Sequence, residues 1–111
     1  MPGKFEIKRA KDKEFFFNLL AHNGEVILTS EMYRSKTGAK KGIAAIRTNA
    51  AEPDRYDRRT DKRKKHYFVL KAANHRIIGC SESYSGTTTM EKGIKSVMKN
   101  GTSTKISDTT S

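Results

Sequence analysis

A short polar pattern occurs twice in this chain, as Ser30-Glu31-x-Tyr33 and as Ser81-Glu82-x-Tyr84. A carboxylate close to a hydroxyl and a phenol could act as a general acid or base. The alternative is structural: the serine caps a turn, the glutamate pairs with a lysine or a helix N-terminus, and the tyrosine covers the sheet edge. Neither copy is accompanied by a nucleophile–base pair or a cofactor motif, which favours the structural interpretation.

A second chemically suggestive feature is a basic stretch at residues 55–65. Cationic side chains interleaved with aromatic rings suit phosphate contact and base stacking, so weak, sequence-tolerant nucleic-acid binding is one hypothesis. The alternative is a solvated hairpin whose charges keep a sheet edge from aggregating. The candidate contacts are Arg55, Arg58, Arg59, Lys62, Arg63, Lys64 and Lys65, with Tyr56 and Tyr67 close by.

The sequence offers little support for other chemistry. The three histidines and Cys80 have no metal-ligand spacing, and no phosphate-binding loop, nucleophile elbow or dinucleotide fingerprint occurs, so neither metal nor cofactor is predicted. Cys80 is interpreted as an inert, partly buried thiol. No apolar run approaches the roughly 20 residues of a membrane span, and no signal peptide is recognised, so we expect a cytoplasmic protein without a membrane partner.

These candidate residues lie on a duplicated framework. A shift of 51 residues aligns the two halves of the 111-residue chain without a gap, and 14 of the 37 positions from 13 to 49 are identical. The duplication predicts two repeats, at 1–51 and 52–101, that share one core, followed at 102–111 by a short terminal strand and a flexible tail. Because the two repeats can satisfy each other, we expect a monomer with internal pseudo-twofold symmetry.

Each repeat is predicted to contain three strands and a helix. Phe15, Phe17, Leu19 and Ala21 alternate as on one face of a strand, and residues 66, 68, 70 and 72 repeat the pattern. Small or apolar residues recur at 39, 42, 43 and 46, and again at 90, 93, 94 and 97, which is typical of an amphipathic helix. Thr88 and Glu91 suggest a capping box in the second helix alone.

Two helical glycines and a set of apolar residues complete the expected core. Gly42 and Gly93 lie on the apolar stripes, which favours close packing over ligand contact. The core is predicted to combine five apolar residues from each repeat: Phe17, Leu19, Ile27, Ile43 and Ile46 with Phe68, Leu70, Ile78, Ile94 and Val97.

Several stretches resemble the YegP-like bacterial family, whose members carry a unit of roughly fifty residues singly or in tandem. In the first repeat they are residues 16–19, 23–25, 27–33 and 41–43, and in the second 67–75, 77–79 and 93–94. The resemblance implies two β-β-β-α-β units joined into one sheet, with their last strands, near 55–60 and 104–108, exchanged. The family has no established activity, so the resemblance implies no chemistry.

We therefore predict an α+β protein with one antiparallel sheet and two helices packed on one face. The favoured function is a non-enzymatic binding or accessory protein whose ligand and partner the sequence does not identify. Nucleic-acid association through 55–65 is the alternative, and an enzyme with paired Ser-Glu-x-Tyr sites is the least favoured hypothesis.

Overall fold

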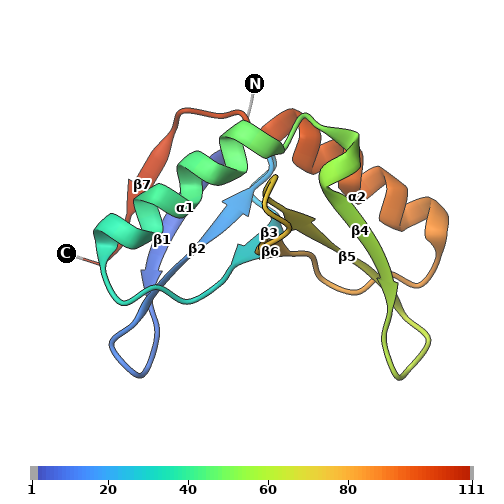
Figure 1. Cartoon of the computed structure of the whole chain (residues 1–111), viewed down its shortest axis with the longest axis horizontal. Coiled ribbons are helices and arrows are strands. Elements are labelled where there is room, and N and C mark those ends of the chain that lie inside the picture. Colours follow the sequence, from blue (N-terminus) through green and yellow to red (C-terminus); the bar gives the residue numbers. More distant parts are fainter. Residues whose placement is uncertain (1–2, 111) are drawn as a thin grey trace.

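The computed structural model describes residues 3–110, which form a seven-stranded sheet and two α-helices (Figure 1). The first repeat contains β1 (Lys4–Arg9), β2 (Phe15–Leu20), β3 (Val26–Ser30) and α1 (Lys36–Asn49). The second contains a 3-10 turn (Pro53–Arg55), β4 (Tyr56–Thr60), β5 (His66–Lys71), β6 (Ile77–Cys80), α2 (Thr87–Asn100) and β7 (Ile106–Asp108).

The strand order is β4-β5-β6-β3-β2-β1-β7, so β3 and β6 join the two repeats at the centre of the sheet. Both helices cover the same face (Figure 1). The predicted α+β fold with two repeats is confirmed, with one correction: the sheet is mixed. The strand β7 lies parallel to β1, because the chain crosses from α2 to the far edge of the first repeat before it pairs.

The shared core follows from the alternation along the strands and the stripes along the helices. All ten residues of the predicted core belong to one buried cluster, which also includes Phe5, Ile7, Leu28 and Tyr56. Phe17 and Phe68 occupy equivalent places and are 1% and 0% exposed. Residues of both repeats therefore contribute to one buried cluster.

Each helical glycine leaves room for a tyrosine ring from the loop that precedes its helix. A Cβ atom at Gly42 would lie 2.2 Å from the Tyr33 hydroxyl oxygen, and one at Gly93 would lie 2.3 Å from that of Tyr84. Each tyrosine also stacks on a core phenylalanine, Phe17 or Phe68, of its own repeat. The packing interpretation of these glycines is confirmed.

The two helix starts are capped differently, and the start of the second helix differs from the prediction. Ser35 caps α1, since its hydroxyl accepts a hydrogen bond from the Gly38 N–H at 3.0 Å. The N-cap of α2 is Gly86, which supplies no side-chain cap. The predicted capping box in the second helix is therefore wrong, because Thr88 lies inside the first turn of α2 and not at its N-cap.

An asparagine at the end of each helix holds the chain that leads into a strand. The Asn100 side-chain oxygen accepts from the Gly3 N–H at 2.7 Å, just before β1. The Asn49 oxygen accepts from Arg55 Nε at 2.9 Å, just before β4. These equivalent bonds fix the first strand of each repeat beneath the helix ends.

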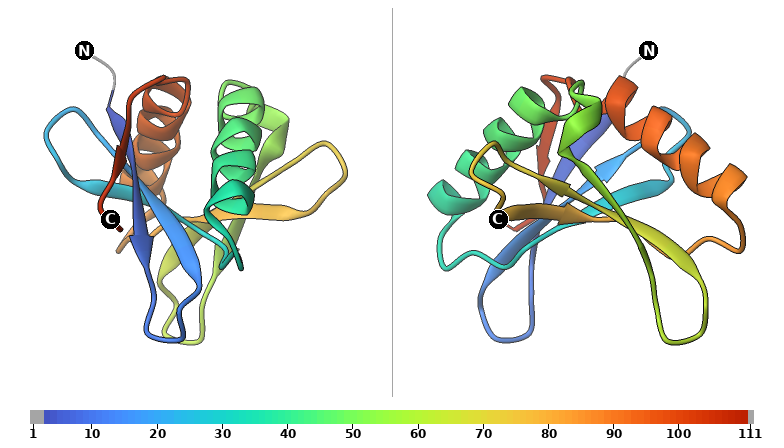
Figure 2. Two further views of the ribbon diagram at one scale, coloured as in Figure 1. Left: turned by 90° about the vertical axis from the view of Figure 1, so that its left-hand side faces the viewer. Right: turned by 45° about the vertical axis from the view of Figure 1, so that its right-hand side comes forward.

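The β1–β2 and β4–β5 hairpins extend to the same side of the molecule, away from the helices (Figures 1 and 2). Their tips are residues 10–14 and 61–65. Among residues 3–110, no helix combines the length and the apolar character needed to cross a membrane.

Candidate functional site

The hydroxyls of the repeated Ser-Glu-x-Tyr pattern are used within the fold. Ser30 Oγ accepts from the Phe17 N–H at 2.9 Å and donates to the Glu31 carbonyl at 2.8 Å. Ser81 does the same with Phe68 and Glu82, at 3.0 and 2.8 Å. Both serines are buried. Each hydroxyl joins two neighbouring strands, because it accepts the hydrogen bond of a backbone N–H that a backbone carbonyl would otherwise accept.

The tyrosines of the pattern are part of the same framework. Tyr33 and Phe15 exchange two backbone hydrogen bonds of 2.7 Å, and Tyr84 and His66 exchange the equivalent pair. Burial raises the pKa of both phenols, and the adjacent carboxylates Glu31 and Glu82 raise it further. Both hydroxyls therefore stay protonated at neutral pH.

One copy of the pattern borders an open groove of about 440 Å³. Glu31 and Tyr33 line it from the first repeat, while Arg76 lines it from the β5–β6 connection of the second. The structure thus brings Glu31 and Tyr33 together in one concavity. Sequence reasoning missed Arg76, which no motif includes, although a comparison of the repeats at equivalent positions 25 and 76 could have singled it out.

The basic stretch divides into a structural part and an exposed part. In the structural part, Arg55 Nε donates a hydrogen bond to the Asn49 side-chain oxygen. Tyr56 is 7% exposed, and its hydroxyl donates a hydrogen bond of 2.6 Å to the Ala50 carbonyl. Burial strongly raises the Tyr56 pKa. Tyr56 cannot offer a ring face to a base, so the structure removes it from the predicted contacts.

Two more of the predicted cations are already paired with carboxylates. Arg58 forms a two-bond pair with Glu91 of α2, with Nη2 2.8 Å from Oε1, and this pair lowers the pKa of Glu91. Arg59 lies 3.0 Å from Asp57, which also contacts Lys71 at 3.2 Å. These two cations lower the pKa of Asp57.

The exposed part is the tip of the β4–β5 hairpin. Within residues 3–110, its four consecutive cations, Lys62, Arg63, Lys64 and Lys65, form no ion pair. Asp61 Oδ1 accepts from the backbone N–H of Arg63 at 2.8 Å and of Lys65 at 2.9 Å, so the tip is an ordered turn. Tyr67 is half-buried and lies opposite Arg59 in the register of β4 and β5.

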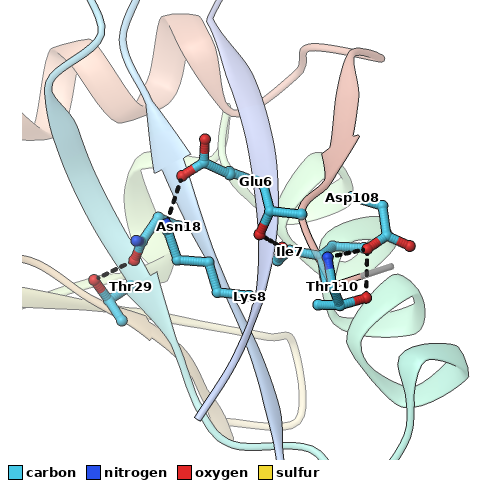
Figure 3. A network of polar contacts seen from close by, with 8 residues as sticks. Glu6, Ile7, Lys8, Asn18, Thr29, Asp108 and Thr110 are labelled. Atoms are coloured by element: carbon cyan, nitrogen blue, oxygen red, sulfur yellow. Dashed lines mark hydrogen bonds and ion pairs between the residues drawn. The ribbon is translucent and has the colours of Figure 1, made fainter.

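Equivalent positions on the helix-free face differ in polarity. Asn18 faces away from the core between Phe17 and Leu19, and its side-chain oxygen accepts from the Thr29 hydroxyl at 2.8 Å (Figure 3). Lys8 and Glu6 pair beside them at 3.2 Å (Figure 3). In the second repeat, the positions of Asn18 and Thr29 are held by Val69 and Cys80.

Cys80 is partly buried, and its thiol lies 3.4 Å from the Ser81 carbonyl oxygen. Burial raises the thiol pKa, which leaves little reactive thiolate at neutral pH. Among the described residues, no three His, Cys, Asp or Glu side chains gather as they would around a metal ion.

Comparison with known proteins matches both repeats to one family model. The model described as "Domain of unknown function (DUF1508)" matches residues 10–57 and again residues 61–108. UPF0339 protein YegP of Yersinia pestis is 52% identical over 108 residues, covering 97% of this chain and 96% of the relative. The chain belongs to the UPF0339, or YegP, family. The predicted family resemblance is confirmed.

Solved structures agree with this assignment. The solution structure of YegP from Escherichia coli has a TM-score of 0.93 at 51% identity, and covers 99% of this chain and 95% of its own. The UPF0339 protein of Shewanella oneidensis gives a TM-score of 0.92 at 50% identity, covering 99% and 93%. The Escherichia coli protein is described as a protein of unknown function, so the relatives establish the fold and leave the activity to be argued from the site.

Proposed function

We propose that this protein is a non-enzymatic binding protein, and that its ligand is nucleic acid held without sequence preference at the tip of the β4–β5 hairpin. The observation that carries the proposal is the run Lys62–Lys65, which forms no ion pair within residues 3–110. Such cations displace the counterions of a phosphate backbone, which supplies most of the free energy of non-specific binding.

The order of the hairpin tip supports this proposal. The two backbone bonds to Asp61 fix the turn, so little backbone entropy remains to be lost when a ligand binds. Lys64 has a φ of +63°, and its counterpart Lys13 has +69°. Glycine or asparagine would adopt this left-handed conformation at a lower cost, yet both tips carry a lysine there.

The neighbouring strand adds a weaker argument. Tyr67 and Arg59 lie side by side across β5 and β4, on the helix-free side of the sheet next to the tip. A half-buried ring beside a guanidinium can stack on one exposed base of a single strand. Because a single ring adds little stacking energy, we expect at best micromolar affinity at physiological salt.

The non-enzymatic part of the proposal rests on how the polar side chains are used. Ser30 and Ser81 both donate and accept within the framework, and neither donates to a histidine or a carboxylate that could activate it. The phenols of Tyr33 and Tyr84 have raised pKa values, which disfavours a role as a base.

Fluorescence anisotropy with labelled single- and double-stranded oligonucleotides at two salt concentrations tests the proposal. We expect binding at low salt that weakens as salt rises, with a slope of about −0.7 per phosphate neutralised on a single strand. The variant Arg63→Glu, Lys64→Glu, Lys65→Glu should weaken binding by about tenfold or more on every sequence tested.

A control variant with the same change in net charge distinguishes binding at the hairpin tip from general attraction by the positive charge of the protein. Lys11→Glu, Lys13→Glu and Lys40→Glu change the net charge by the same amount, but lie on the other hairpin and on α1. We expect this control to retain most of the affinity. An equal loss of affinity in both variants would mean that nucleic acid is attracted by the overall charge and not by the hairpin tip. The absence of binding at low salt would refute the proposal that nucleic acid is the ligand.

A further inference from the structure

A groove lies between α1 and the β5–β6 connection, and its lining includes no residue of the hairpin tip. We propose that it binds a small organic anion with an apolar body, of which a medium-chain carboxylate is the simplest example. Figure 1 shows the connection (yellow) beside α1, and residues from both elements line the groove.

The groove has the size and the surface of a ligand site. Its volume of about 440 Å³ is within the range of small-molecule pockets. The lining includes Tyr33, Gly42 and Ile78, which belong to the packed framework, and Met32, which is 50% exposed. Methionine adapts its shape to apolar ligands because its side chain is unbranched and flexible.

Two cations give the groove its preference for an anion. Arg76 and Lys41 are exposed among the lining residues and form no ion pair within residues 3–110. The backbone of Arg76 is held by its N–H bond to Asn74 Oδ1 at 3.0 Å. An arginine can bind a carboxylate through two parallel hydrogen bonds, whereas the single lining carboxylate, Glu31, offsets only one of the two cations.

The second repeat supplies an internal comparison. Its equivalent positions keep the tyrosine, the lysine and the first carboxylate, as Tyr84, Lys92 and Glu82. The differing positions make the first groove more apolar, less obstructed and more cationic: Met32 against Ser83, Ala45 against Ser96, Gly38 against Thr89, and Arg76 against Glu25.

The equivalence of Arg76 and Glu25 holds in space as well as in sequence. Burial raises the pKa of both phenols; Arg76 partly offsets this rise at Tyr33, while Glu25 adds to it at Tyr84, so each charge acts on the tyrosine of the opposite repeat. One set of positions thus has two cations and one carboxylate, and the other has one cation and two carboxylates. An amphipathic anion is attracted to the first and repelled by the second.

Titration of the ¹⁵N-labelled full chain with sodium octanoate, followed by amide chemical shifts, tests this inference. We expect saturable shifts around Tyr33, Lys41 and Arg76, weaker effects with acetate, and none of that pattern with octylammonium. Arg76→Glu should weaken octanoate binding by about tenfold or more, and Arg76→Gln by less. Amide dispersion of each variant reports whether it is folded.

Matched variants make the test specific. Glu25→Arg combined with Ser83→Met should create a second set of saturable shifts around Tyr84. The hairpin variant Arg63→Glu, Lys64→Glu, Lys65→Glu should leave octanoate binding unchanged, so failure of the nucleic-acid proposal would not affect this one. Equal binding of octylammonium, unchanged binding by Arg76→Glu, or shifts that miss the groove would each overturn the inference.

Discussion

The two repeats keep the same interior and differ along their edges. The serine link, the tyrosine on the helical glycine and the asparagine at the helix end recur with nearly the same geometry. The outer edges differ, because β7 covers β1, whereas within residues 3–110 no strand covers β4. Duplication therefore preserved the contacts that one buried core requires, while the sheet edges were free to diverge.

The cover over β1 depends on residues that the second repeat lacks. Arg47 Nε donates to the Ser103 carbonyl at 2.6 Å, and Lys36 lies 2.9 Å from Asp108. The equivalent positions in α2 are Met98 and Thr87, which could form neither contact. The two contacts help to hold the C-terminal strand against the first repeat.

The largest effects should come from the shared core. Phe17→Ala and Phe68→Ala each remove a fully buried ring at equivalent places, and each should lower the free energy of unfolding by about 3–5 kcal/mol. Urea unfolding measures both values. If the repeats contribute equally to one core, the two losses should be similar, and a large loss from one variant with almost none from the other would contradict that view.

The glycine–tyrosine contact should give the next largest effect. Gly42→Ala and Gly93→Ala place a methyl group against the ring of Tyr33 or Tyr84, and each should cost about 1–3 kcal/mol despite the better helix propensity of alanine. Thermal or urea unfolding detects the change. Stabilisation by either alanine would show that the tyrosine moves aside easily.

The pairing of β7 with β1 should weaken when Arg47 of α1 is replaced by methionine, the residue at the equivalent position of α2. Arg47→Met removes the bond to the Ser103 carbonyl, and should reduce local stability by about 1–2 kcal/mol. Hydrogen exchange at the Phe5 N–H, which bonds to the Lys105 carbonyl at 2.9 Å, reports the loss. The control Met98→Arg should change exchange in neither edge strand, because within residues 3–110 no further strand lies on the outer side of β4 for an arginine to anchor.

The same edge should respond to acid. Hydrogen bonds from Thr110 and the nearby Lys36 hold the Asp108 pKa well below its usual range. The Asp108 carboxylate therefore stabilises the β1–β7 edge fully above its unfolded pKa of about 4, and this stabilisation is lost as the pH falls below that value. We expect protection of the Phe5 N–H to decrease from about pH 4 downward. Asp108→Asn should remove most of this pH dependence, and an unchanged profile would exclude Asp108 as its source.

The smallest effect concerns the helix starts. Gly86→Ser gives α2 the cap that Ser35 provides to α1, and should stabilise the protein by a few tenths of a kcal/mol. The reverse change, Ser35→Gly, should cost a similar amount. Differential scanning calorimetry of both variants compares the caps, and destabilisation by Gly86→Ser would mean that the glycine is needed for another reason.

The sequence alone determined the duplication, the core and the packing role of the helical glycines. Each prediction rests on a local regularity: alternation in strands, the stripe in helices, and identity at a fixed shift. The predicted capping box is wrong because α2 begins two residues earlier than the box requires, with Gly86 and not Thr88 at the N-cap.

Only the tertiary structure decided which charges and rings are free. In the sequence, Arg58 and Lys64 are two similar cations of one basic stretch. In the structure, Arg58 pairs with Glu91, 33 residues away in the chain, whereas Lys64 is exposed to solvent. Tyr56 is buried because α1 ends above it, and Arg76 lines the same groove as Tyr33 because the two repeats fold against each other. Binding surfaces depend on such contacts between distant residues, and no local pattern in the sequence encodes them.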